Sequence, residues 1–143
     1  MKSFLTIVSA LIVSTTLQAA PSTTPPQHAK VELGKYRAVD AETRSIFANF
    51  ELKANGTVDF KVQSPETDGP IYCQGRYSVK GNKFFADLAC DSFFLSEASV
   101  QIDITNVNPV SLRSENGVAV AVIIDALGSD PNTFLLKKDE PKK

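Results

Sequence analysis

Apolar and polar residues alternate along much of this chain, and this period of two constrains its fold more than any other feature. The alternation is clearest in residues 46–53, 58–62 and 100–105, where every second side chain is apolar. This pattern is typical of half-buried antiparallel strands. It predicts strands at 33–40, 46–53, 57–63, 71–80, 83–90, 99–106, 109–113, 117–124 and 133–138.

Turn residues separate these strands at short intervals, which is typical of an all-β sandwich or barrel. We expect an antiparallel up-and-down β-barrel of about eight strands, with a β-sandwich as the alternative. No segment has a clear helical stripe, although residues 91–98 have room for one helical turn.

The two ends of the chain differ in composition from the alternating body. Residues 1–19 combine Lys2, an apolar run over 4–13 and Ala19, which is the order of a cleavable signal peptide. The run is too short for a bilayer span, which needs about 20 apolar residues. We therefore expect a flexible leader at 20–30, a barrel domain at 31–138 and a polar tail at 139–143.

Cleavage after Ala19 predicts a periplasmic or secreted protein with no membrane span. The terminal lysines and the polar outward strand faces argue against an outer-membrane barrel.

Two hairpins can be placed in register from their turns. A three-residue loop at 54–56 pairs Leu52 with Val58 and needs a positive φ at Gly56. A two-residue loop at 81–82 sets Cys73 opposite Cys90 at a non-hydrogen-bonded pair, where α-carbons approach most closely. We therefore predict a structural disulfide Cys73–Cys90 on the core side, since an exported chain meets an oxidising environment.

The sequence offers no catalytic or metal-binding signature. His28, the one histidine, falls in the expected leader, where it cannot be held for general-base chemistry. With both cysteines in a disulfide, no thiol remains as a nucleophile or zinc ligand. We expect a non-enzymatic protein without catalytic residues, cofactor or metal.

The charge balance excludes another class of partner. Loss of Lys2 with the signal peptide leaves 14 basic and 16 acidic residues. Because this balance is close to neutral, it gives no field that would attract nucleic acid or anionic lipid.

Several apolar residues are candidates for ligand binding, although core packing explains each of them as well. They are Tyr36, Phe50, Tyr77, Phe84, Phe93 and Phe94. Phe50, Tyr77 and Phe84, together with Phe60, are large enough to fill a small barrel. Phe93 and Phe94 lie between two strands, where they could line a ligand entrance or plug a barrel end. The stripe Ala119, Ala121 and Ile123 could meet a partner.

Three segments resemble those of the small bacterial lipocalin-like, or calycin-type, barrels. These are Gly34-Lys-Tyr36, the stretch from Phe50 to Thr57 through Asn55-Gly56, and residues 75–82. The resemblance covers residues 33–90 and implies a barrel that holds a small apolar ligand. The chain lacks the Gly-x-Trp of true lipocalins because it has no tryptophan.

Two classes of function remain open. The first is a binding module for a small apolar ligand, favoured by small inward residues that could leave a void (Gly34, Ala38, Ala48, Gly75 and Ala86). The second is an envelope interaction protein or enzyme inhibitor that acts through its outer surface and loops. Short strands enclose an interior that side chains can fill, so we expect a filled or nearly filled barrel.

Overall fold

The computed structural model describes residues 30–63 and 68–141 of the 143-residue chain. These residues form eight strands, one short α-helix and one 3-10 turn. The elements are β1 (Gly34–Asp40), β2 (Ile46–Leu52), β3 (Thr57–Val62), β4 (Ile71–Lys80), β5 (Lys83–Cys90), β6 (Glu97–Asp103), α1 (Pro109–Leu112), β7 (Val118–Ile124), η1 (Asp125–Leu127) and β8 (Asn132–Lys138).

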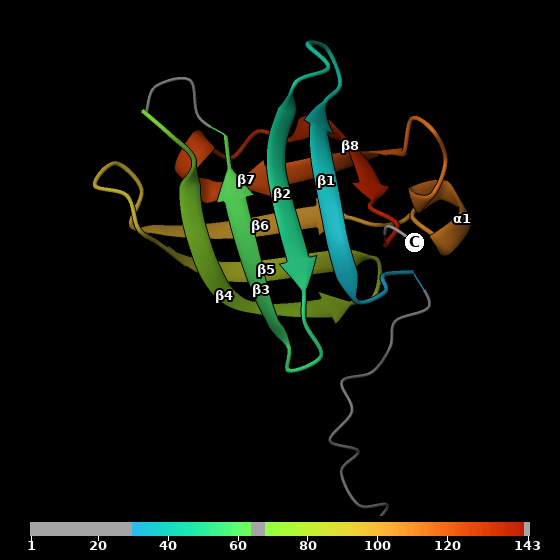
Figure 1. Ribbon diagram of the computed structural model, residues 1–143, viewed down its shortest axis with the longest axis horizontal. Helices are drawn as coiled ribbons and strands as arrows, with labels where there is room; N and C mark the ends of the chain where they lie inside the picture. Colours follow the sequence, from blue (N-terminus) through green and yellow to red (C-terminus); the bar gives the residue numbers. More distant parts are fainter. Residues whose placement is uncertain (1–29, 64–67, 142–143) are drawn as a thin grey trace, which may run out of the picture.

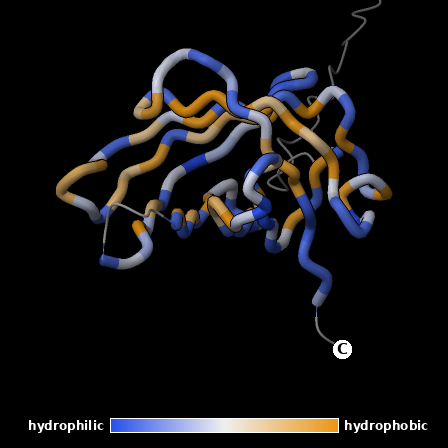
Figure 2. The backbone as a smooth tube through the Cα atoms, turned by 90° about the horizontal axis from the view of Figure 1, so that it is seen from above, coloured by the Kyte–Doolittle hydropathy of each residue, from blue (hydrophilic) through white to orange (hydrophobic). Residues whose placement is uncertain are grey.

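The eight strands make a closed antiparallel barrel in which each strand pairs with its neighbours in the chain and β8 pairs with β1 (Figure 1). The predicted up-and-down barrel is therefore confirmed, and the sandwich alternative is wrong. The alternation that predicted the strands can be followed along the tube in Figure 2. It places one set of side chains in a single apolar core inside the barrel.

Both predicted hairpin registers are confirmed. Leu52 pairs with Val58, and Gly56 has the positive φ (80°) that the three-residue loop needs. Cys73 lies opposite Cys90 and forms a disulfide with it. Gly75 lies on the same hairpin where the backbones run very close, because a Cβ on it would fall 1.7 Å from the carbonyl oxygen of Asp87. No side chain larger than hydrogen fits there.

The strand predicted at 109–113 is wrong, because this segment is the helix α1. The Asn108 side chain accepts a hydrogen bond from the Ser111 amide (2.8 Å), and the Ser111 hydroxyl accepts one from the Asn108 amide (3.0 Å). This reciprocal capping, with proline in the first turn, stabilises a helix start. Leu112 faces the core and is fully buried.

Two further expectations differ from the structure near strand ends. The strand expected at 99–106 begins at Glu97 and ends at Asp103, where the carboxylate accepts a hydrogen bond from the Thr105 amide and begins a turn. It includes residues 97 and 98, so the helical turn considered at 91–98 is absent.

At the start of β2, a register shift lies where Ala38 pairs with Ala48 but Val39 pairs with Ile46. The alternation of residues 48–52 predicts that Ile46 points inward and Phe47 outward. The bulge reverses this, because it leaves Ile46 exposed and brings Phe47 against Phe134.

Up-and-down connectivity gives the barrel two different ends. The β1–β2, β3–β4, β5–β6 and β7–β8 connections meet at one end, which we call the open end. The β2–β3 and β4–β5 turns and the segment containing α1 meet at the other, which we call the closed end. Figure 1 shows α1 beside the end of β8 at the closed end, on the right.

The predicted signal peptide and most of the predicted leader lie outside the described residues. Lys30, the last residue of that leader, donates a hydrogen bond from Nζ to Asn82 Oδ1 (2.8 Å) at the closed end. The predicted polar tail also contacts the barrel, since Asp139 pairs with Arg37 (2.5 Å) and Glu140 pairs with Arg113 (3.2 Å). In the described part of the chain, no helix has the length and apolar character needed to cross a membrane.

Candidate functional site

Aromatic rings stack across the barrel interior from the closed end. The rings of Tyr36 and Phe50 lie 5.1 Å apart and nearly parallel, and Phe50 stacks in turn on Phe60 (4.7 Å). Tyr77 stacks on Phe84 (5.6 Å) beside them. These rings come from β1 to β5 and fill the interior next to the closed end with apolar side chains.

The Tyr36 hydroxyl is satisfied within this closed end. It donates a hydrogen bond to the carbonyl oxygen of Glu32 (2.6 Å) and accepts one from the amide of the same residue (3.0 Å). Burial raises the pKa of Tyr36 well above its usual range, so the ring stays neutral and uncharged. Tyr36 therefore helps to close this end of the barrel, and its hydroxyl is not available as an acid.

The segment between β6 and β7 completes the closure. Ile104, Val107 and Leu112 are 1%, 2% and 0% exposed, which places all three in the core although the segment is mostly irregular. Together with the aromatic stack, they plug this end of the barrel.

The other half of the interior contains a cavity of about 570 Å³. This volume falls within the range of pockets that hold small molecules. Its wall is contributed by all eight strands and by the connections at the open end. The lining residues are Ala38, Phe47, Ala48, Phe50, Phe60, Val62, Gln63, Ile71, Cys73, Leu88, Phe94, Leu95, Ala98, Val100, Ile102, Val120, Val122, Ile124, Ala126, Leu127, Phe134 and Leu136.

The chemistry of this wall is uniform. Gln63 contributes the one polar side chain among these lining residues, no ionisable side chain takes part, and Cys73 is held in the disulfide. The cavity therefore offers burial to an apolar group and offers no compensation for a buried charge.

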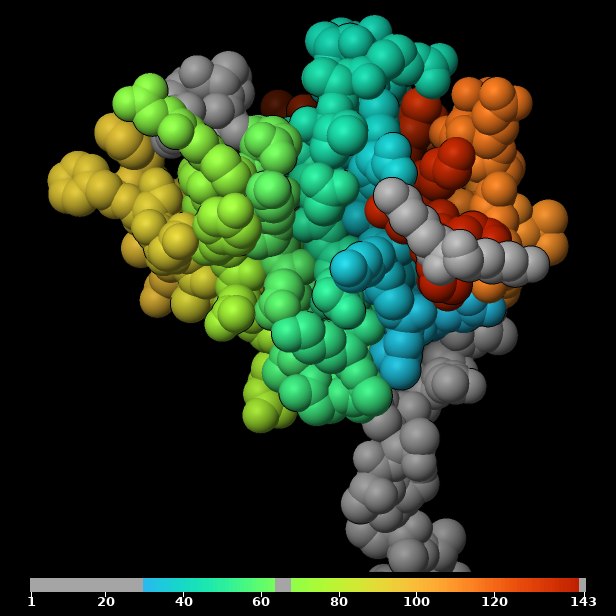
Figure 3. Space-filling model, in the orientation of Figure 1, coloured from blue at the N-terminus to red at the C-terminus, as the bar shows by residue number. Residues whose placement is uncertain are grey.

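The cavity opens to solvent between the loops of the open end. Phe94 and Leu127 both line it, yet they are 80% and 61% exposed. Figure 3 shows segment 91–96 (dark yellow) projecting from the body of the molecule at the left. Phe93 is 98% exposed at the same tip and packs edge-on against Phe94 at 5.7 Å.

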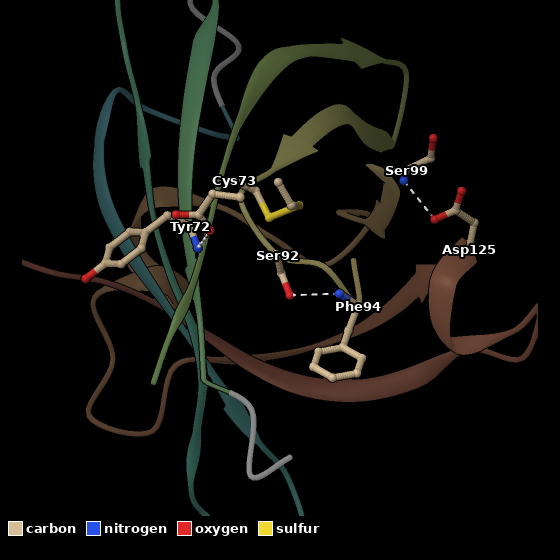
Figure 4. Close-up of a disulfide and its surroundings, with 8 residues drawn as sticks. Tyr72, Cys73, Ser92, Phe94, Ser99 and Asp125 are labelled. Atoms are coloured by element: carbon tan, nitrogen blue, oxygen red, sulfur yellow. Dashed lines mark hydrogen bonds between the residues drawn. A yellow bond between two sulfur atoms is a disulfide. The ribbon is translucent and has the colours of Figure 1, made fainter. Parts of the chain in front are cut away.

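The disulfide holds the base of this projecting loop. It joins β4 to the end of β5, directly before residues 91–96, and Asp91 accepts a hydrogen bond from the Tyr72 amide (2.9 Å). Figure 4 shows the bridge beside the loop that carries Ser92 and Phe94, with the Ser92 hydroxyl accepting from the Phe94 amide (3.2 Å). The base of the entrance is thus covalently fixed.

The predicted binding residues separate into three groups. Phe50 and Phe94 line the cavity. Tyr36, Tyr77 and Phe84 lie at the closed end, outside the cavity wall, and Phe93 is exposed beside the entrance.

The sequence analysis missed most of the cavity wall. The inward positions of β6, β7 and β8 line the cavity, as do Ala126 and Leu127 of η1. For the strands, the period-two alternation was the signal that could have found them. For η1, which lies in a connection, no such signal exists.

The interior is hollow over one half, which differs from the filled barrel we expected. Two of the small inward residues, Ala38 and Ala48, line the cavity, and Ala98 and Ala126 add further short side chains. Gly34, Gly75 and Ala86 do not line it. Tyr36, Tyr77 and Phe84 fill the closed end, whereas the rings of Phe47 and Phe134 form part of the cavity wall and leave the space between the walls open.

Within the described ranges, no group of His, Cys, Asp and Glu residues could hold a metal ion. His28 lies outside those ranges. The fold and the site thus define a closed eight-stranded β-barrel with an apolar cavity that opens at one end. Comparison with known protein families, with curated proteins and with solved structures finds no match.

Proposed function

We propose that this protein is an exported, non-enzymatic binding protein that holds a small apolar molecule in the open half of its barrel. The observation that carries the proposal is the cavity of about 570 Å³ with its apolar wall. Eight-stranded barrels are just wide enough to hold one small ligand, and lipocalins use them in this way. The absence of an ionisable side chain from the described cavity wall favours binding over catalysis.

Export is supported by two features. The first 19 residues have the order of a signal peptide, and the Cys73–Cys90 disulfide is of the kind that persists in oxidising compartments. We therefore propose a periplasmic or secreted location.

The test of ligand binding is occlusion of the cavity. Wild-type protein is titrated with the neutral fluorophore N-phenylnaphthylamine, whose emission rises in an apolar site. Ala48→Phe and Ala98→Phe place a ring in the cavity from opposite walls, and each is expected to weaken probe binding at least about tenfold. Ala119→Phe makes the same change on the exposed face of β7 and is the matched control.

Near-ultraviolet circular dichroism shows whether each variant retains its packed core. Absence of probe binding by the wild type, or equal binding by the control and by both folded cavity variants, refutes the proposal.

A second function, interaction with a protein partner, is favoured by one observation. Phe93 and Phe94 are largely exposed side by side at the entrance, and exposed aromatic pairs are enriched at interfaces. Native mass spectrometry of protein purified from its own host separates the two functions. A co-purifying small molecule supports the cavity, whereas a stoichiometric protein partner supports the surface.

A further inference from the structure

The charge at the entrance of the cavity is strongly unbalanced. We define the rim as residues 40–46, 68–70, 91–97 and 125–132, which are the described connections of the open end with the strand residues that flank them. The rim contains one basic residue, Arg44, and seven acidic residues, and so carries a net charge of −6. The acidic residues are Asp40, Glu42, Asp68, Asp91, Glu97, Asp125 and Asp130.

The rest of the described chain has the opposite sign. It contains eleven basic and eight acidic residues, a net charge of +3. In the described part of the chain, negative charge is therefore concentrated around the cavity entrance. Such a field attracts cations to the entrance and repels anions from it.

Among the described residues, no side chain forms an ion pair with a rim carboxylate. The ion pairs found among the described residues are Arg37–Asp139, Lys53–Asp59, Arg113–Glu32, Arg113–Glu140 and Lys138–Glu32. None of these pairs includes a rim residue.

Three rim carboxylates are instead fixed by backbone amides. Asp40 accepts hydrogen bonds from Glu42 and Thr43 (2.9 and 2.8 Å), and Asp125 accepts them from Ser99 and Ala126 (both 2.8 Å). Asp91 is held by the Tyr72 amide, as described above. Amide hydrogen bonds favour the ionised carboxyl, and those from Thr43 and Glu42 lower the pKa of Asp40. Asp40 is thus ionised at neutral pH.

The interior and the rim together restrict how a ligand can lie. A charged group in the cavity would lose its hydration without finding a partner, because no ionisable side chain lines the described wall. The closed end is plugged, so the open end is the way in. A ligand with one charged group must enter with its apolar part first and leave that group at the rim.

From this arrangement we infer that the ligand is a single-chain amphiphile whose apolar tail fills the cavity and whose cationic head group stays at the acidic rim. The inference rests on the proposed function and specifies its ligand class. The apolar rim side chains of Phe94 and Leu127 contact the tail where it leaves the cavity, while the surrounding carboxylates face the head group.

The test compares three ligands that share a ten-carbon chain and differ in head group. Decyltrimethylammonium, decanol and decanoate compete with N-phenylnaphthylamine for the wild-type protein. The two ionic ligands are used below their micellar concentrations, and decanol is used below its solubility limit. The cation is expected to bind at least about tenfold more tightly than decanoate at low ionic strength, with decanol between them. One exposed charge pair at 4 Å contributes about 1 kcal/mol in water, and several rim carboxylates act on the head group together. Added salt reduces the difference because the rim is exposed to solvent.

A matched pair of variants assigns the preference to the rim. Glu42→Gln with Glu97→Gln removes two rim charges, whereas Glu51→Gln with Glu115→Gln removes two charges elsewhere and leaves the rim intact. The rim variant is expected to reduce the ratio of cation to anion affinity at least about threefold, while decanol binding stays unchanged. The control keeps the wild-type ratio.

The outcomes separate the inference from the proposed function. Equal binding of all three ligands, tighter binding of decanoate, or the same ratio in the rim variant as in the control overturns the inference and leaves the cavity as a binding site. Failure of the probe and of all three ligands to bind overturns the proposed function itself.

Discussion

Replacement of Leu112 by alanine tests whether the plug at the closed end stabilises the barrel. The side chain is 0% exposed and lies in the core cluster, although it belongs to a four-residue helix outside the sheet. The variant loses the transfer free energy of the removed carbons, about 0.8 kcal/mol for each, and gains an internal void. Fully buried Leu→Ala changes cost about 2–5 kcal/mol, and we expect about 3–4 kcal/mol here.

The assay is urea unfolding followed by circular dichroism. The midpoint is expected to fall while the dependence on urea concentration stays constant, since the folded state keeps its overall surface. Val110→Ala in the same helix is the control, because Val110 is 81% exposed and its loss should cost less than about 0.5 kcal/mol. A loss below about 1 kcal/mol for Leu112→Ala, or equal losses in both variants, refutes the role of the plug. Binding of the neutral probe should persist, because Leu112 does not line the cavity.

Three further predictions concern the barrel wall and the ion pairs. Gly75→Ala should lose at least about 3 kcal/mol of stability in urea unfolding, because the new Cβ clashes with the β5 backbone; wild-type stability would contradict this. Native protein should resist maleimide labelling at Cys73 and Cys90 and lose about 3 kcal/mol on reduction, whereas labelling without reductant would exclude the bridge. The hydrogen bond and charge of Lys138, aided by Arg113, lower the pKa of Glu32 below 4.5, so its contribution to stability is complete above pH 4.5 and is lost as pH falls through the folded-state value. The stability difference between wild type and Glu32→Gln should therefore shrink on acidification, and a difference independent of pH would contradict this.

Strand pairing could be predicted closely because local chemistry sets it. A side-chain period of two and a glycine with positive φ leave few registers in which the apolar face stays together. The 54–56 loop and the alignment of Cys73 with Cys90 follow from these two constraints alone. At Phe47 the same argument fails, since a bulge depends on the neighbouring strand β1 and leaves no periodic mark.

The helix α1 was missed for a different reason. Four residues complete barely one turn, so no helical periodicity exists to be seen. The capping residue Asn108 and the following Pro109 were the available signal, and both also suit a turn. The burial of Leu112 then depends on the open space at the end of the barrel, which is a tertiary property.

The cavity and the rim charge illustrate two limits of sequence reasoning. Cavity volume depends on where large and small inward residues lie along the barrel axis. Here Tyr36, Tyr77 and Phe84 fill the closed end, and the short side chains of Ala48 and Ala98 line the cavity. The net charge of −1 for the whole chain conceals this separation, because acidic residues gather at the rim while the excess of basic residues is spread over the rest of the described chain. Summing charge over alternate connections would have found it, since in an up-and-down barrel every second connection shares an end.

This division between ends has a consequence for how such a protein diversifies. The plug and the aromatic stack contribute buried apolar surface at one end, and the four connections at the other end surround the entrance. Insertions or substitutions in segments 41–45, 91–96 and 125–131 leave the strand registers untouched, because each segment begins and ends on strands already fixed by their other neighbours. The ligand or partner that such a barrel recognises can therefore be changed by transplanting loops, while the eight strands are kept as a common scaffold.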